Sequence, residues 1–262
     1  MAEIKVAVRI DCLPVKLPKA LQLAAATGAT GVEIDARNGI RPSELSDTGL
    51  RQLRKMLDDL NLRVVTVRFP TRRGYDNPQD LDRRVEATKA AMKLAYRLGA
   101  RVVINQVGNI PEDCEDPRYS SLASVLEDLG RFGARVGAFL AAETGTESGE
   151  TLAKLITSSD DAYIAAALNP GQLIINRHSP REAIVALGDR IHAVCAVDGV
   201  IDLAAGRGVA VPLGQGTADF PELLSLLENF QYRGYFTVGR REMSPDTVWD
   251  ELSQGVEYLR NL

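Results

Sequence analysis

Carboxylate side chains stand at the ends of several short apolar runs of this chain, where they can act in proton transfer. We expect Glu143 to serve as a general base, with Glu33 or Asp198 as its partner, because paired carboxylates can remove and return a substrate proton. Arginines at similar places can stabilise an oxygen that becomes negatively charged during the transfer. The residues that we predict to bind the substrate are Asp11, Arg37, Arg68, Gln106, Asn169, Gln172 and Arg240.

These residues can meet only if the chain brings the ends of the apolar runs together. Short β-branched runs, which are typical of strands, alternate with longer amphipathic stretches, which are typical of helices. The predicted strands cover residues 4–10, 31–35, 63–68, 101–106, 137–142, 163–168, 190–196 and 235–239. The predicted helices cover residues 17–27, 43–60, 78–98, 119–135, 148–158, 179–187, 219–230 and 245–260.

Residues that favour helix ends lie at the borders of these helices. Serine, aspartate and asparagine favour the first position because their side chains accept the free backbone N–H groups, and glycine favours the position after the last turn. The predicted start signals are Ser43, Asn77, Asp219 and Ser244, and the predicted stop signals are Gly28, Gly99 and Gly188.

The alternation predicts the α/β class and a single (β/α)8 TIM barrel domain over residues 1–262. Eight strand–helix units in 262 residues average about 33 residues each, which is the size of one such unit. A doubly wound open sheet is the alternative, but no Gly-x-Gly-x-x-Gly motif follows the first strand. In a barrel the carboxyl ends of the strands form one mouth. The longest connection, residues 199–218, is expected to be functional.

Composition narrows the classes of partner. The 31 Lys and Arg residues against 35 Asp and Glu residues give a net charge of −4, and no block of basic residues favours a nucleic acid or a membrane surface. No apolar stretch is long enough for a membrane helix, and no signal peptide is evident. The three cysteines, Cys12, Cys114 and Cys195, suggest neither a disulfide framework nor a structural zinc site. We expect a cytoplasmic protein with a small-molecule ligand.

Several segments of the chain resemble the xylose isomerase-like barrel superfamily of sugar and sugar-phosphate isomerases and epimerases. Residues 31–35 (GVEID) resemble its second strand, and residues 169–173 (NPGQL) resemble its Asp-Pro-Gly-His-Leu element. Residues 190–198 resemble its seventh strand, which usually ends in His-x-Lys-Asp. Residues 212–220 and 232–238 are similar to its Gly-x-Gly, Asp-Phe and Tyr-x-Gly signatures. The resemblance covers the whole barrel and implies the same fold, and it allows a homo-oligomer.

The resemblance also implies a divalent metal held at four strand ends. The matching positions in this chain are Glu143, Asn169, Cys195 and Gly239, of which only Glu143 keeps the family's residue. Hard cations such as Mg²⁺ need several oxygen ligands, so this set is a poor one. A bulge that turns Glu242 inward is the alternative route to a fourth ligand. We therefore expect a degenerate metal site, with no cofactor identified.

Two classes of function remain open. The first is a sugar or sugar-phosphate isomerase/epimerase-like protein that binds a small polyhydroxylated or carboxylated ligand at the barrel mouth. The second is a non-catalytic barrel that serves as a ligand-binding or protein-interaction module. Opposed pKa shifts of two titratable groups around a concave pocket would indicate an enzyme, whereas Phe139 or Arg240 filling the mouth would indicate the second class.

Some residues have a structural interpretation beside the functional one. Arg68, Arg72 and Arg73 form a cluster that can hold a phosphate or carboxylate, or is simply solvated charge. Residues 214–217 (GQGT) suit either a phosphate site or a turn. We expect Cys195 to be a buried small hydrophobe.

Overall fold

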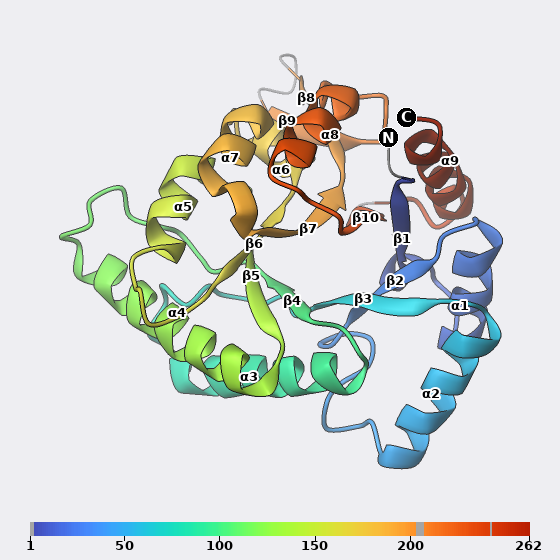
Figure 1. Cartoon of the computed structure of the whole chain (residues 1–262), viewed down its shortest axis with the longest axis horizontal. Helices are drawn as coiled ribbons and strands as arrows, with labels where there is room; N and C mark the ends of the chain where they lie inside the picture. The colour runs from blue at the N-terminus through green and yellow to red at the C-terminus, as the bar shows by residue number, and fades with distance from the viewer. Residues whose placement is uncertain (1–2, 203–206, 242) are drawn as a thin grey trace.

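Eight parallel strands close into a barrel in the computed structural model, which describes residues 3–202, 207–241 and 243–262. Neighbouring strands pair in the order β1-β10-β7-β6-β5-β4-β3-β2, around a common centre (Figure 1). Every pair is parallel. The barrel strands are β1 (Lys5–Arg9), β2 (Gly31–Asp35), β3 (Arg63–Arg68), β4 (Val102–Asn105), β5 (Phe139–Glu143), β6 (Ala165–Leu168), β7 (Ile191–Ala196) and β10 (Tyr235–Val238).

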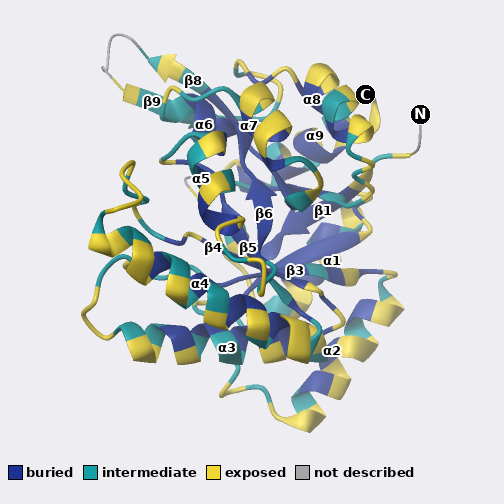
Figure 2. Cartoon of the chain, turned by 60° about the vertical axis from the view of Figure 1, so that its left-hand side comes forward, coloured by how far each residue is buried: buried dark blue, intermediate teal, exposed yellow. Residues whose placement is uncertain are grey.

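Helices surround the barrel, and their buried sides face the strands (Figure 2). In α3, Val85, Met92 and Ala95 recur at helical spacing and are buried, as an amphipathic helix requires. In the described part of the chain, no helix is long and apolar enough to cross a membrane. The helices are α1 (Leu17–Ala26), α2 (Asp47–Asp59), α3 (Leu81–Arg97), α4 (Pro117–Val136), α5 (Gly149–Ile156), α6 (Pro170–Ile175), α7 (Pro180–Leu187), α8 (Phe220–Asn229) and α9 (Val248–Arg260), with short 3-10 turns η1 (Ile10–Cys12) and η2 (Gly188–Arg190).

The predicted (β/α)8 barrel is confirmed. An open sheet is excluded because β1 pairs with β2 on one side and with β10 on the other, which closes the sheet. Each of the eight predicted strands is present, with ends shifted by at most a few residues. The predicted stop signals also hold: Gly28, Gly99 and Gly188 follow the ends of α1, α3 and α7. Gly28 and Gly99 have φ of 83° and 81°, a conformation that favours glycine.

A two-stranded hairpin and a short α-helix lie where no strand or helix was predicted. The connection 199–218 contains an antiparallel hairpin of β8 (Asp198–Asp202) and β9 (Arg207–Val211). The helix α6 follows β6 without a loop, because the Asn169 side chain accepts a hydrogen bond from the Gln172 backbone N–H at 3.1 Å and thereby caps the helix.

Three helices begin three or four residues later than predicted. The helix α2 starts after Ser46 rather than Ser43, since the Ser46 hydroxyl accepts a backbone N–H three residues on at 3.1 Å. The helix α3, predicted from residue 78, starts after Asp80, which has a φ of 54°. The helix α9 begins at residue 248, beyond the predicted signal Ser244. Asp219 caps α8 as predicted.

Apolar side chains fill the barrel interior below the carboxyl ends of the strands, and polar side chains form the next level, at those ends. Ala141, Ala165, Ala167 and Ala193 belong to a buried cluster inside the barrel, apart from the larger core between barrel and helices. Side chains alternate along a strand, so the next inward position on β5 after Ala141 is Glu143, at the carboxyl end. The small alanine side chains therefore leave room for long polar side chains at the carboxyl ends of the strands.

Candidate active site

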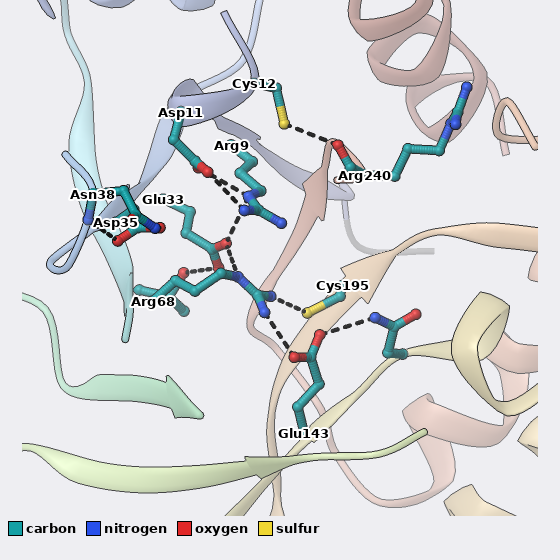
Figure 3. A network of polar contacts seen from close by, with 12 residues as sticks. Arg9, Asp11, Cys12, Glu33, Asp35, Asn38, Arg68, Glu143, Cys195 and Arg240 are labelled. Carbon is teal, nitrogen blue, oxygen red and sulfur yellow. Dashed lines mark hydrogen bonds and ion pairs between the residues drawn. The ribbon is translucent and has the colours of Figure 1, made fainter. Parts of the chain in front are cut away.

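Arg68, at the end of β3, lies at the centre of the polar level and joins three other strands (Figure 3). Its Nε donates to Oε1 of Glu33 on β2 at 2.6 Å, and its Nη1 donates to Oε2 of Glu143 on β5 at 2.7 Å. Its Nη2 donates to Sγ of Cys195 on β7 at 3.1 Å. All four residues are buried. The guanidinium therefore uses each of its nitrogens on a different strand of the barrel.

Glu143 is held as a carboxylate by its surroundings. Burial acts to raise the pKa of Glu143, but the charge and hydrogen bond of Arg68, with a hydrogen bond from Asn169, bring the pKa below its usual value. The second oxygen, Oε1, accepts the Asn169 Nδ2–H at 2.9 Å. Both oxygens are thus engaged. A carboxylate with a lowered pKa is a weak general base, so the geometry does not favour the base role predicted for Glu143.

Arg68 is in turn held as a cation. Burial acts to lower the pKa of Arg68, but Glu143 and Glu33 together raise it well above its usual value. A second arginine, Arg9 on β1, extends the cluster: it donates to both carboxylate oxygens of Asp11, at 2.8 and 2.6 Å, and its Nε lies 3.9 Å from Oε1 of Glu33. The predicted residues Asp11, Glu33, Arg68 and Glu143 therefore form one connected network.

The positions matched to the family's metal ligands do not fit a divalent cation. Two of them, Glu143 and Cys195, are bonded to the Arg68 guanidinium, and burial raises the pKa of the Cys195 thiol, which keeps it protonated and a poor ligand. At Gly239, with a φ of 130°, a Cβ would lie 2.8 Å from the Arg9 Cβ, so a larger ligating side chain lacks space there. No group of three or more His, Cys, Asp or Glu residues in the described ranges is placed to hold a metal.

A cavity of about 380 Å³, which we call the mouth cavity, lies over the ends of β3 to β6. Gln106, Glu143 and Gln172, predicted from three different segments, all line it, as does Glu147. Burial raises the pKa of Glu147, and the Thr146 hydroxyl only partly offsets this. Two carboxyl groups in one cavity thus have pKa values shifted in opposite directions, which was the arrangement expected of an enzyme.

Glu147 was missed by the sequence analysis. It lies in the loop between β5 and α5, four residues beyond Glu143, and Glu143 was the only residue predicted from this segment. A carboxylate in a loop that follows a barrel strand is a general signal for the mouth, and that signal would have found it.

Asp198, predicted as a catalytic partner, lies at the start of β8, where its carboxylate holds the turn at residues 214–218. It is fully buried, and its carboxylate accepts backbone N–H groups from four residues at 2.8 to 3.1 Å. A Cβ on Gly216 would lie 2.0 Å from the Asp198 Oδ1, so the carboxylate fits against glycine. The N–H groups of Gly214 and Gly216 are already used. This favours the turn interpretation of residues 214–217 over the phosphate site.

The side chains of two other predicted residues lie outside both the mouth cavity and the network around Arg68. The Arg240 side chain points away from Arg68 and its partners (Figure 3). It forms a bidentate ion pair with Glu251 on α9, at 2.6 and 2.9 Å. Arg37 donates to the Pro70 carbonyl at 2.7 Å and lines a separate cavity. Phe139 packs against His192 with ring centroids 5.9 Å apart, at the start of β5. Neither Arg240 nor Phe139 fills the mouth. Glu242 lies outside the described residues.

The sequence and the fold both match known proteins. The model of the xylose isomerase-like TIM barrel family matches residues 21–262. Two curated relatives, both named inosose dehydratase, come from Bacillus thuringiensis (strain Al Hakam) and Bacillus cereus (strain 03BB102). Each is 23% identical over 216 residues, which cover 71% of this chain and 72% of the relative.

Two solved structures are similar over nearly the whole chain. A xylose isomerase domain protein from Planctomyces limnophilus has a TM-score of 0.85 at 22% identity, covering 99% of this chain and 96% of that chain. A 3-keto-D-glucoside 4-epimerase from E. coli, in its apo form, has a TM-score of 0.78 at 14% identity, with 100% of both chains covered. At these identities the structures establish a shared fold. With the family model matching residues 21–262, the chain belongs to the xylose isomerase-like TIM barrel family.

Proposed function

We propose that the mouth cavity catalyses proton transfer of the sugar isomerase or epimerase type on a small polyhydroxylated or carboxylated molecule, without a resident divalent cation. The observation that carries the proposal is the pair of carboxyl groups with opposed pKa shifts, Glu143 and Glu147, in one cavity. The names of two relatives, a 3-keto-D-glucoside 4-epimerase and an inosose dehydratase, support a keto-sugar or keto-polyol as the substrate.

Glu147 is the residue that we assign to the proton transfer. A raised pKa brings a carboxyl group closer to the working pH, where it can both accept and return a proton. Glu143, which stays ionised, accepts a hydrogen bond from a substrate hydroxyl through a remaining lone pair. Gln106 and Gln172 line the same cavity and bind further hydroxyl groups. The earlier prediction that Glu143 is the base stays a prediction, and the variants below distinguish the two carboxylates.

Arginines supply the positive charge in this proposal. Arg73 lines the mouth cavity, and its guanidinium stabilises the substrate oxygen that becomes negative when the neighbouring carbon loses its proton. Arg68 is a positioning residue, because it bonds to Glu143 and does not itself line the cavity. It fixes the charge and the orientation of that carboxylate.

The test is deuterium exchange from solvent into keto-sugars and keto-polyols, followed by proton NMR on chelator-treated protein. We expect exchange at the carbon beside the carbonyl, at a rate that rises with pH as Glu147 loses its proton. Glu147→Gln should lower the rate about 10²- to 10⁴-fold, and Glu143→Gln should mainly raise KM. The control is Glu150→Gln, which removes an exposed carboxylate of α5 that pairs with Lys154. Loss of exchange on chelation, or an unchanged rate in Glu147→Gln, would overturn the proposal.

A non-catalytic barrel is the second candidate function. It is favoured by the engagement of both Glu143 oxygens by Arg68 and Asn169, since a fixed carboxylate suits binding as well as catalysis. This alternative predicts that keto-polyols bind in calorimetry while no deuterium exchange occurs in any of them.

A further inference from the structure

A second cavity, of about 750 Å³, lies beside the mouth cavity, between the loop after β2, the loop after β3 and α3. We call it the arginine cavity, because six arginines line it and Asp80 is the only carboxylate among its described lining residues. The six are Arg37, Arg41, Arg72, Arg73, Arg83 and Arg84.

The positive charge of this cavity is almost uncompensated within the described residues. Among the six, only Arg41 forms an ion pair in the described residues, with the exposed Glu44 at 3.0 Å, and Asp35 acts on Arg37 through its charge alone. Arg37, Arg73 and Arg84 donate hydrogen bonds to neutral carbonyl or amide oxygens. The exposed side chains of Arg72 and Arg83 take part in no hydrogen bond or ion pair with the part of the chain that the structure describes.

Two further observations show that the chain itself accommodates these arginines poorly. The Nε of Arg84 is buried without a hydrogen-bond partner, and an unpaired buried donor is costly. Burial lowers the pKa of Arg37, and repulsion from Arg72 lowers it further. Gathering like charges in one cavity is unfavourable unless a ligand of opposite charge neutralises them.

We propose that the arginine cavity binds a small molecule through a phosphate group. A phosphate dianion accepts several charge-assisted hydrogen bonds at once and matches the planar fork of guanidinium groups, and Arg72 and Arg83 are free to provide them. A single carboxylate would satisfy fewer of the donors. Phe69, Ala87 and Ala90 give the cavity an apolar wall, which suits the organic part of a phosphate ester.

The size and surroundings of the cavity favour a small ligand over a nucleic acid. Its volume lies within the range of about 300–1,000 Å³ that is common for small-molecule sites, and the whole chain has a net charge of −4. Residues 71–73 line both this cavity and the mouth cavity, so a bound phosphate ester lies next to the mouth. The inference concerns binding alone and stands whether or not the mouth is catalytic.

Calorimetric titration with phenyl phosphate and with inorganic phosphate tests this inference at low salt. We expect saturable binding of phenyl phosphate, weakened at least tenfold by Arg72→Ala and by Arg83→Ala, because each removes charge-assisted hydrogen bonds. Both side chains are exposed, so the variants should fold, which circular dichroism checks. The control is Arg51→Ala, which removes the same charge from an exposed position on α2 outside the cavity.

Three results would overturn the inference. The first is no binding by the wild type at millimolar ligand. The second is an equal loss in Arg51→Ala, which would mean that general surface charge attracts the ligand. The third is tighter binding of benzoate than of phenyl phosphate, which would assign the cavity to carboxylates.

Discussion

Replacing Arg68 by methionine should lower the free energy of unfolding by about 3–5 kcal/mol at neutral pH. The change removes the cation that bonds to two buried carboxylates, Glu33 and Glu143, and breaking a buried ion pair by removing one partner has costs of this size. Arg68 is only 8% exposed, so water does not replace the lost charge. A loss of this size is a large part of the roughly 5–15 kcal/mol that stabilises a typical domain.

The deficit of Arg68→Met should depend on pH. In the wild type the pKa of Glu143 lies below its usual value, so this carboxylate stabilises the fold above its unfolded pKa and less as the pH falls through its folded pKa. Without Arg68, burial raises the pKa of Glu143, and the variant then loses stability as the pH rises. The difference between the two proteins should therefore shrink from about pH 7 to about pH 4.5.

Urea unfolding at both pH values measures this effect. The matched control is Arg51→Met, an exposed arginine of α2, for which we expect a change within about 0.5 kcal/mol. Adding Glu33→Gln and Glu143→Gln to Arg68→Met should recover most of the loss, because no buried charge is then left unpaired. A loss below about 1 kcal/mol at neutral pH, or the same loss at both pH values, would refute the reasoning.

Two other predictions concern stability and thiol reactivity. Gly216→Ala should lower the free energy of unfolding at least about twice as much as Gly99→Ala, because the new Cβ would meet the Asp198 carboxylate. At Gly99 nothing lies within 4 Å of a Cβ, so that only the positive φ costs about 1 kcal/mol. Equal losses in urea unfolding would contradict this. In native protein at neutral pH, the exposed Cys114 should react rapidly with a disulfide reagent. Cys195 should not react, because it is buried and burial raises its pKa. Rapid labelling of Cys195, detected by peptide mass mapping, would contradict the buried network.

Much of the fold could be predicted because each barrel unit repeats a local pattern. Runs such as residues 63–68 are apolar enough for strands buried on both faces, and the rhythm of the units indicates a closed barrel. The β8–β9 hairpin was missed although residues 198–202 and 207–211 both carry β-branched side chains, because it interrupts that rhythm. Helix starts were shifted where several capping residues lie close together, as with Ser43 and Ser46.

The candidate site was predicted only in part, since its contacts depend on closure of the barrel. Strand ends placed Glu33, Arg68 and Glu143 at the same mouth, but not the bonds between them. Arg68 is 35, 75 and 127 residues away from its three partners, and no local pattern shows which side chain reaches the axis. Asp198 is likewise positioned by backbone groups 16 to 20 residues away in the sequence.

The central claim is that the Arg68 guanidinium occupies the place where relatives are expected to hold a divalent cation. Thermal unfolding with and without metals tests this claim most directly. Chelator-treated protein is melted alone and with Mg²⁺, Mn²⁺, Zn²⁺ or Co²⁺, in the wild type and in Glu143→Gln. A metal bound only by the native state, at about 100 times its Kd, adds about 2.7 kcal/mol, which raises the Tm by several degrees. We predict no rise with any of the four metals. A rise of that size in the wild type that disappears in Glu143→Gln would contradict the account.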